Sequence, residues 1–228
     1  MAKTTKFING VFITIIIYFI AILLGFYLNK IVPIFSPTFW THSLMLLLSI
    51  LVIYLFKKDV HYQISLPKFK KTLKPILFGC LTSIIVPMIV TIIILAFGGK
   101  LEGSKLMENI TPLQAIIFIF IYGPIAEELL FRGFLLNYLA PLSNRSIVIF
   151  KRHISLSVII AALMFGLAHF ILLASGQSIS FVINTFCFTF TLGIFSGYYQ
   201  TKYHNNAYAI ITHMSGNLFA VLVLILTY

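Results

Sequence analysis

The chain has 228 residues, of which 60% are hydrophobic and only 9% are charged. Its mean hydropathy of +1.05 exceeds what a soluble domain of this length can bury, so the composition predicts a protein that crosses a membrane several times. The net charge of +11 lies in short connections between apolar segments, which favours membrane lipids, and not nucleic acid, as partners. Cys80 and Cys187 lie in separate apolar runs, which argues against a disulfide framework or a thiolate metal cluster.

Seven stretches each approach the roughly 20 residues that span the hydrocarbon core of a bilayer. In chain order they cover about residues 7–28, 39–56, 75–97, 112–132, 156–174, 179–200 and 205–227. The first stretch exceeds the apolar core of a signal peptide and has no small-residue cleavage site at its end, so we expect it to be retained. We therefore predict an all-α fold, a polytopic transmembrane bundle that forms one integral membrane domain over residues 1–228.

The lysines and arginines predict the orientation of this bundle. With the N-terminus in the cytoplasm, twelve basic residues fall in cytoplasmic connections and three fall outside, as the positive-inside rule requires. The cytoplasmic set is Lys3, Lys6, Lys57, Lys58, Lys68, Lys70, Lys71, Lys74, Arg145, Lys151, Arg152 and Lys202, and the outer set is Lys30, Lys100 and Lys105.

The fourth predicted span contains three fully charged side chains, Glu127, Glu128 and Arg132, in an otherwise uncharged stretch. A charge in hydrocarbon costs about 2.5–3.5 kcal/mol even on lenient insertion scales, so these groups require a partner or a function. On a helix, Glu128 and Arg132 share a face, whereas Glu127 points about 100° away. The pattern predicts that Arg132 pairs with Glu128 and that Glu127 faces a cavity as a general base. The alternative is that Glu128 and Arg132 form a purely structural ion pair and that Glu127 is an additional acid without a catalytic role.

Two later spans contain buried polar side chains. His169 ends the sequence FGLAH in the fifth span, and His213 and Asn217 lie four residues apart in the last. Such groups are satisfied at least cost by meeting one another, so we expect the three spans to converge. Counted at about 1.5 Å per residue from the cytoplasmic ends, Glu127 lies ~8 Å deep, His213 ~12 Å and His169 ~20 Å. His169 therefore fits only if its helix starts late or tilts, or if water fills a funnel around it.

Three motifs occur in order on these spans: Glu-Glu-x-x-x-Arg at 127–132, Phe-x-x-x-His at 165–169 and His-x-x-x-Asn at 213–217. Together they resemble the CPBP family, also called CAAX prenyl protease type II, bacteriocin-processing or Abi proteins. All three lie within about residues 123–219, which we take as the catalytic motif region. The four other histidines, His42, His61, His153 and His204, lie at span ends or in loops, and we assign them no role.

This resemblance implies hydrolysis of peptide bonds inside the membrane. Glu127 and His169 would activate a water molecule, His213 and Asn217 would stabilise the tetrahedral oxyanion, and Glu128 and Arg132 would support the helix. The first motif, Glu-Glu-x-x-x-Arg, differs from the His-Glu-x-x-His pattern by which a zinc site is recognised in a sequence. We therefore expect no cofactor. The alternative is a metalloprotease in which Glu127, His169 and His213 hold zinc.

The substrate that the resemblance implies is a membrane-associated or lipidated protein or peptide, in processing or in bacteriocin immunity. An amino-acid composition rich in Ile, Phe, Lys and Asn suggests that the protein is located in a bacterial plasma membrane. Two other classes stay open at this point. The polar cluster could hold together a non-catalytic immunity or scaffold protein. It could also form a proton or metal relay in a carrier, although carriers usually show internal repeats, and the sequence has none.

Overall fold

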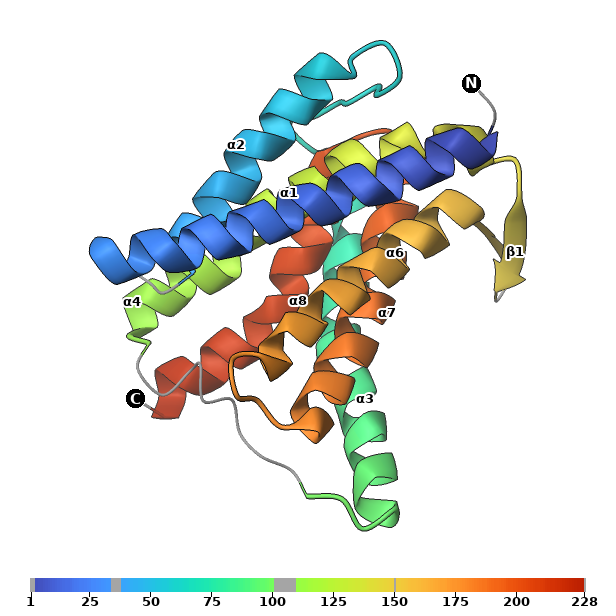
Figure 1. Ribbon diagram of the computed structural model, residues 1–228. Coiled ribbons are helices and arrows are strands. Elements are labelled where there is room, and N and C mark those ends of the chain that lie inside the picture. The colour runs from blue at the N-terminus through green and yellow to red at the C-terminus, as the bar shows by residue number, and fades with distance from the viewer. Residues whose placement is uncertain (1–2, 34–37, 101–109, 150, 228) are drawn as a thin grey trace.

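The computed structural model describes the chain except for residues 1–2, 34–37, 101–109, 150 and 228. Lys105 of the expected outer set lies outside the described residues. Long helices dominate the fold (Figure 1). Five of them are α1 (Lys3–Ile31), α2 (Phe39–Leu55), α3 (Phe69–Ala96), α7 (Ile179–Tyr203) and α8 (Asn206–Thr227).

The fourth predicted span is one continuous helical rod whose winding changes along its length. It consists of α4 (Pro112–Gln114), the π-helical segment η1 (Ala115–Tyr122), the regular turns of α5 (Gly123–Glu128) and a second π-helical segment η2 (Leu129–Leu136). A Thr111 capping box starts the rod, because the hydroxyl accepts from the Gln114 N–H while the Gln114 side chain accepts from the Thr111 N–H. The short 3₁₀ turn η3 (Ala140–Leu142) follows the rod.

A small antiparallel hairpin precedes the fifth span, a feature that the sequence did not predict. Its strands are β1 (Ser146–Ile149) and β2 (Arg152–Ser155), with Ile147 opposite Ile154. The span itself is α6 (Leu156–Ala168), capped by the Ser155 hydroxyl and extended by the 3₁₀ turn η4 (His169–Leu173). The hairpin is an addition to an all-helical bundle and leaves the predicted fold class unchanged.

The predicted membrane architecture is confirmed, since within the described residues six helices are long and apolar enough to cross a bilayer. The remaining predicted span, the second in chain order at 39–56, corresponds to α2, which has 17 residues and is shorter than the others. The third span begins at Phe69 and not at residue 75, because Pro75 is accommodated inside α3.

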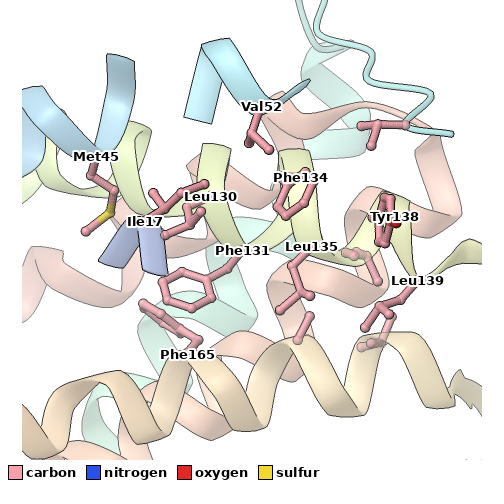
Figure 2. Close-up of a cluster of buried hydrophobic side chains, with 14 of the residues drawn as sticks. Ile17, Met45, Val52, Leu130, Phe131, Phe134, Leu135, Tyr138, Leu139 and Phe165 are labelled. Atoms are coloured by element: carbon pink, nitrogen blue, oxygen red, sulfur yellow. The ribbon is translucent and has the colours of Figure 1, made fainter. Parts of the chain in front are cut away.

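The helices pack in two groups around the fourth span. Helix α1 packs on α2, while α3, α7 and α8 pack on one another and α6 packs on α7. The η2 segment lies between α2 and α6. Figure 2 shows the apolar cluster at this junction, with η2 in the middle and α6 along one side. Its labelled members are Ile17, Met45, Val52, Leu130, Phe131, Phe134, Leu135, Tyr138, Leu139 and Phe165.

The connections that carry most of the basic residues meet at one end of the bundle. Lys6 near the start of α1 donates to Asp59 at 2.6 Å. The connection from α2 to α3 in turn pairs with the α7–α8 turn, because the Asn205 side chain donates to the Ser65 carbonyl at 3.0 Å. The N-terminus and the hairpin also lie at the same end in Figure 1. The positive-inside rule predicts that this end faces the cytoplasm.

Candidate functional site

Glu127 and Glu128 lie on α5, between the two π-helical segments. The π-helical hydrogen bond from the Gly123 N–H to the Phe118 carbonyl shifts the pairing pattern just before Pro124. Proline has no N–H, so the next carbonyl in the series, that of Ile119, is left without a backbone donor. Single π-helical turns are frequent at functional sites, where they rotate side chains out of the regular helical register.

Asn217 of α8 supplies the missing donor. Its Nδ2 donates to the Ile119 carbonyl at 2.9 Å. An unpaired carbonyl at this depth would cost several kcal/mol, so this contact explains locally why α8 packs on η1. One N–H of the amide is used in this way. The oxyanion role expected for Asn217 would fall to its second N–H and stays a prediction.

Glu128 is completely buried and held from two sides. Its Oε1 lies 3.0 Å from Nη1 of Arg132, one turn further along the same helix. The same oxygen accepts a hydrogen bond from Nδ1 of His213 at 2.9 Å. The predicted pairing of Glu128 with Arg132 is therefore confirmed, and His213 joins it. These contacts tie α8 to the fourth span.

The Arg132 guanidinium lies fully buried between a ring and a glycine. Its Cζ stands 4.5 Å from the centre of the Phe165 ring, a cation–π contact that is strengthened by the absence of water. On the other side a Cβ at Gly193 would come within 2.7 Å of Nη2. The glycine of α7 thus makes the space that the guanidinium occupies.

Glu127 keeps 19% of its side-chain surface exposed, whereas none of Glu128 is exposed. Its two oxygens face two imidazoles. Nε2 of His42 lies 3.5 Å from Oε1, and Nε2 of His213 lies 3.6 Å from Oε2. These separations exceed those of strong hydrogen bonds, so the Glu127 carboxylate lies between the two imidazoles without being tightly bound by either. The division between a buried and an accessible glutamate agrees with the prediction.

His169 lies next to this cluster through Phe165. The Phe165 ring stands 5.1 Å from the His169 ring and 5.3 Å from the His213 ring. Nδ1 of His169 lies 2.9 Å from the Phe165 carbonyl. A carbonyl only accepts, so Nδ1 carries the hydrogen and Nε2 of the neutral ring is left as a free acceptor. Among the described residues, no ion pair or hydrogen bond joins His169 to either glutamate.

The conflict in depth between Glu127 and His169 becomes smaller because the fourth span is longer than predicted. The rod continues to Leu136 and not 132, which puts Glu127 about 14 Å from its cytoplasmic end at ~1.5 Å per residue. His213 then lies about 10 Å and His169 about 20 Å from the starts of their helices. The aromatic contacts through Phe165 bridge the remaining difference.

His42 is the site residue that the sequence did not identify. It stands in the first turn of α2, outside the three motifs, and was assigned no role. In the structure its side chain is 14% exposed and points at Glu127. The only signal in the sequence was a titratable side chain within a predicted span, at 39–56, that has no acidic neighbour in the chain. His61, His153 and His204 form no contact with the glutamates among the described residues.

The predicted zinc ligands do not form a ready-made metal site. Within the described residues, no group of three or more His, Cys, Asp or Glu side chains is arranged to hold a metal ion. Of the expected set, Glu127 and His213 face each other, while His169 stands beyond the Phe165 ring. Binding of zinc by all three would require His169 to move, and the zinc alternative stays a prediction.

Comparison with known protein families gives one match. The sequence model of the family described as Type II CAAX prenyl endopeptidase Rce1-like matches residues 109–219. No curated protein and no solved structure matches the chain. The matched region contains Glu127, Glu128, Arg132, His169, His213 and Asn217, and excludes His42. The match over residues 109–219 therefore supports membership of the type II CAAX prenyl endopeptidase (CPBP) family of intramembrane proteases.

Proposed function

We propose that this protein hydrolyses peptide bonds with a metal-free glutamate site in which Glu127 is the general base. The observation that carries this proposal is the unequal treatment of two adjacent carboxylates. Glu128 is buried and neutralised by Arg132 and His213, whereas Glu127 stays partly exposed between two imidazoles. A structural ion pair does not need a second, accessible acid in a region where each charge is costly.

In the proposed reaction, Glu127 takes one proton from water while the water oxygen attacks the scissile carbonyl carbon. The resulting tetrahedral oxyanion collapses, the carbon–nitrogen bond breaks, and the proton held by Glu127 passes to the leaving nitrogen. The net change is the addition of one water across the peptide bond. The free Nε2 of His169 would accept a hydrogen bond from the same water, since Nδ1 already donates to the Phe165 carbonyl.

The oxyanion would be stabilised by His213 and the unused N–H of Asn217. One such donor contributes about 2.7–4 kcal/mol to acyl transfer when it is preorganised in a site that excludes water. His213 would take this role as an imidazolium, in which Nδ1 donates to Glu128 and the hydrogen on Nε2 is left to donate to the oxyanion.

The proposed substrates are membrane-associated or lipidated peptides, reached in a bacterial plasma membrane from the cytoplasmic side. Processing of a bacteriocin, or immunity to one, would be the cellular role. Support comes from the family description, from the basic residues at one end of the bundle, and from amino-acid usage. A non-catalytic immunity protein is the second candidate, and it makes the opposite prediction in the experiment below.

The test compares wild-type protein with the near-isosteric variant Glu127→Gln, both purified in lipid nanodiscs. The probes are an internally quenched peptide with a prenylated C-terminal CAAX sequence and an unprenylated apolar peptide. We expect Glu127→Gln to lower kcat at least about 1000-fold, because a general base and its charge are lost together. Asp59→Asn, the same change at the surface, is the matched control and should retain activity.

In the producing cell, the phenotype to measure is processing of a bacteriocin or immunity to one. It should disappear in Glu127→Gln while the protein stays abundant in the membrane. A phenotype that survives the substitution would refute catalysis and leave the cluster as architecture. Zinc content is measured on the same samples. Activity that is lost with a chelator and restored by added zinc would favour the metalloprotease alternative with Glu127, His169 and His213 as ligands.

A further inference from the structure

The first turn of α2 lies directly against the start of α5 and brings His42 to Glu127. Its Nε2 stands 3.5 Å from Oε1 of the glutamate, opposite His213 at Oε2. The ring is mostly buried, and its edge faces Tyr122 with the ring centres 6.4 Å apart.

Three contacts hold this turn in place. Ser43 shares a hydrogen bond of 2.9 Å with the Tyr122 hydroxyl, and the Phe39 ring stacks on Tyr122 at 6.1 Å. Gly123 leaves room for the imidazole, because a Cβ there would lie 3.3 Å from its Cε1. The position of His42 is therefore determined by the residues that precede the glutamate pair and not by its own contact with Glu127.

The polar balance of the site also requires a residue at this position. Arg132 is one positive charge beside two carboxylates, and it lies at Glu128. Among the described residues, two imidazoles face the oxygens of Glu127, those of His42 and His213, and His213 already donates to Glu128. Nδ1 of His42 is buried without a hydrogen-bond partner in the described part of the chain. Such an atom needs a reason, because an unpaired buried polar group costs about 1–3 kcal/mol.

We propose that His42 is a further functional residue of this site, a positioning residue that holds Glu127 by Oε1 and aims its other oxygen at the water. It lies outside the matched region 109–219, so the site is completed by a helix that carries none of the three motifs. The inference rests on the proposed function for the role of Glu127 as the base. The contact itself does not depend on that role.

The kinetic test uses His42→Leu, which fills similar space without a donor, and His42→Gln, which retains an N–H. We expect His42→Leu to lower kcat on the cleaved probe about 10- to 100-fold, the loss typical of a misplaced catalytic group. KM should stay within about twofold, because the residue acts through the base and does not bind substrate. His42→Gln should recover most of the rate, and His61→Leu, at an exposed histidine of the α2–α3 connection, is the control.

An unchanged kcat in His42→Leu overturns the proposal. A loss that is equal in the leucine and glutamine variants, with raised KM and a lowered Tm, also overturns it, since that pattern indicates packing alone.

Infrared spectroscopy tests the contact even if neither probe is cleaved. The carboxylate band of Glu127 is assigned by difference between wild type and Glu127→Gln. This band should shift in His42→Leu and stay near its wild-type position in His42→Gln and in His61→Leu. An unshifted band in His42→Leu shows that His42 does not hold Glu127. Absence of cleavage by the wild type together with a shifted band refutes the proposed function and retains the His42 contact.

Discussion

Arg132 shows how a single residue of this site depends on space provided elsewhere. Its guanidinium is fully buried and has one ionic partner, Glu128, at 3.0 Å. None of its nitrogens has an aligned hydrogen bond among the described residues. The Phe165 ring adds a cation–π contact to this pair, and Gly193 leaves the space that the guanidinium occupies. Removing one partner of a buried ion pair lowers stability by about 3–5 kcal/mol. A displacement of the Arg132 side chain should therefore also disturb Glu128 and the residues that contact it.

We predict that Gly193→Ala displaces Arg132 and weakens both stability and activity. The added Cβ would come within 2.7 Å of Nη2, and overpacking of this kind costs about 1–3 kcal/mol. Thermal unfolding in nanodiscs and kcat on the cleaved probe measure the two effects. Gly197→Ala is the control on the same helix, because its Cβ would instead meet a Val158 methyl at 3.0 Å. Equal activity in the two variants would contradict this account of Gly193.

The winding of the fourth span is the decisive feature at the scale of an element. Two π-helical segments flank α5, and side chains from other helices bind the carbonyls that this winding leaves free. Asn217 donates to Ile119 in the first segment, and Gln200 of α7 donates to the Arg132 carbonyl at 2.8 Å in the second. The local geometry of the glutamate pair is therefore set jointly by Pro124 and by polar residues on α7 and α8.

We predict that Asn217 and Pro124 are coupled. Asn217→Leu leaves the Ile119 carbonyl unpaired and should lower the unfolding free energy by about 1–3 kcal/mol. Pro124→Ala restores a backbone N–H that can take this carbonyl, so the same substitution should cost less in that background. Thermal unfolding of the four proteins in the cycle gives the coupling. Additive effects would show that the carbonyl does not depend on Asn217.

The same cycle separates the structural from the catalytic role of Asn217. If its second N–H stabilises the oxyanion, kcat should fall by a similar factor whether residue 124 is proline or alanine. If the amide serves only the Ile119 carbonyl, Pro124→Ala should restore part of the lost rate.

At the scale of the whole molecule, the basic connections meet at one end of the bundle, and Lys6 and Asp59 join two of them. The hydrogen bond from Lys6 holds the pKa of the exposed Asp59 carboxyl below its ordinary value. A depressed carboxyl pKa contributes stability at neutral pH that is lost as the pH falls below about 4 and the group is protonated. The contribution should be small, because the pair is at the surface.

We therefore predict that Asp59→Asn lowers Tm slightly at pH 7 and that the difference from wild type disappears as the pH falls through the lowered pKa of Asp59. Differential scanning fluorimetry across this range, at low and high salt, measures it. A Tm difference that stays constant with pH would show that the asparagine acts through packing and not through loss of the charge.

The orientation of the bundle is a second prediction at this scale. In a background with Cys80 and Cys187 replaced by alanine, a cysteine at Lys151 should react with an impermeant thiol reagent only from the cytoplasmic side. A cysteine at Lys100, in the α3–α4 connection, should react only from outside. The physical reason is the excess of lysine and arginine at the end that carries the hairpin. Labelling of intact cells against inside-out vesicles distinguishes the two, and the reverse pattern would contradict the assigned orientation.

The sequence by itself determined the helical spans and the chemistry of the motif residues. Hydropathy located the spans to within a few residues at most ends, because a membrane helix must satisfy its own backbone and its length is bounded by the bilayer. The spacing of Glu128 and Arg132 was sufficient to predict their ion pair, since residues four apart on a helix are neighbours. The charge of Glu127 in an apolar stretch marked the site before any contact was known.

Only the tertiary structure decided which side chains meet Glu127 and how the fourth span is wound. His42 is 85 residues away in the chain and belongs to no motif, so its contact depends on how α2 packs against α5. The use of Asn217 by the Ile119 carbonyl depends in the same way on how α8 packs against η1. Spacing along a chain reports neighbours within one helix, whereas contacts between helices are set by the shapes of the faces that pack together.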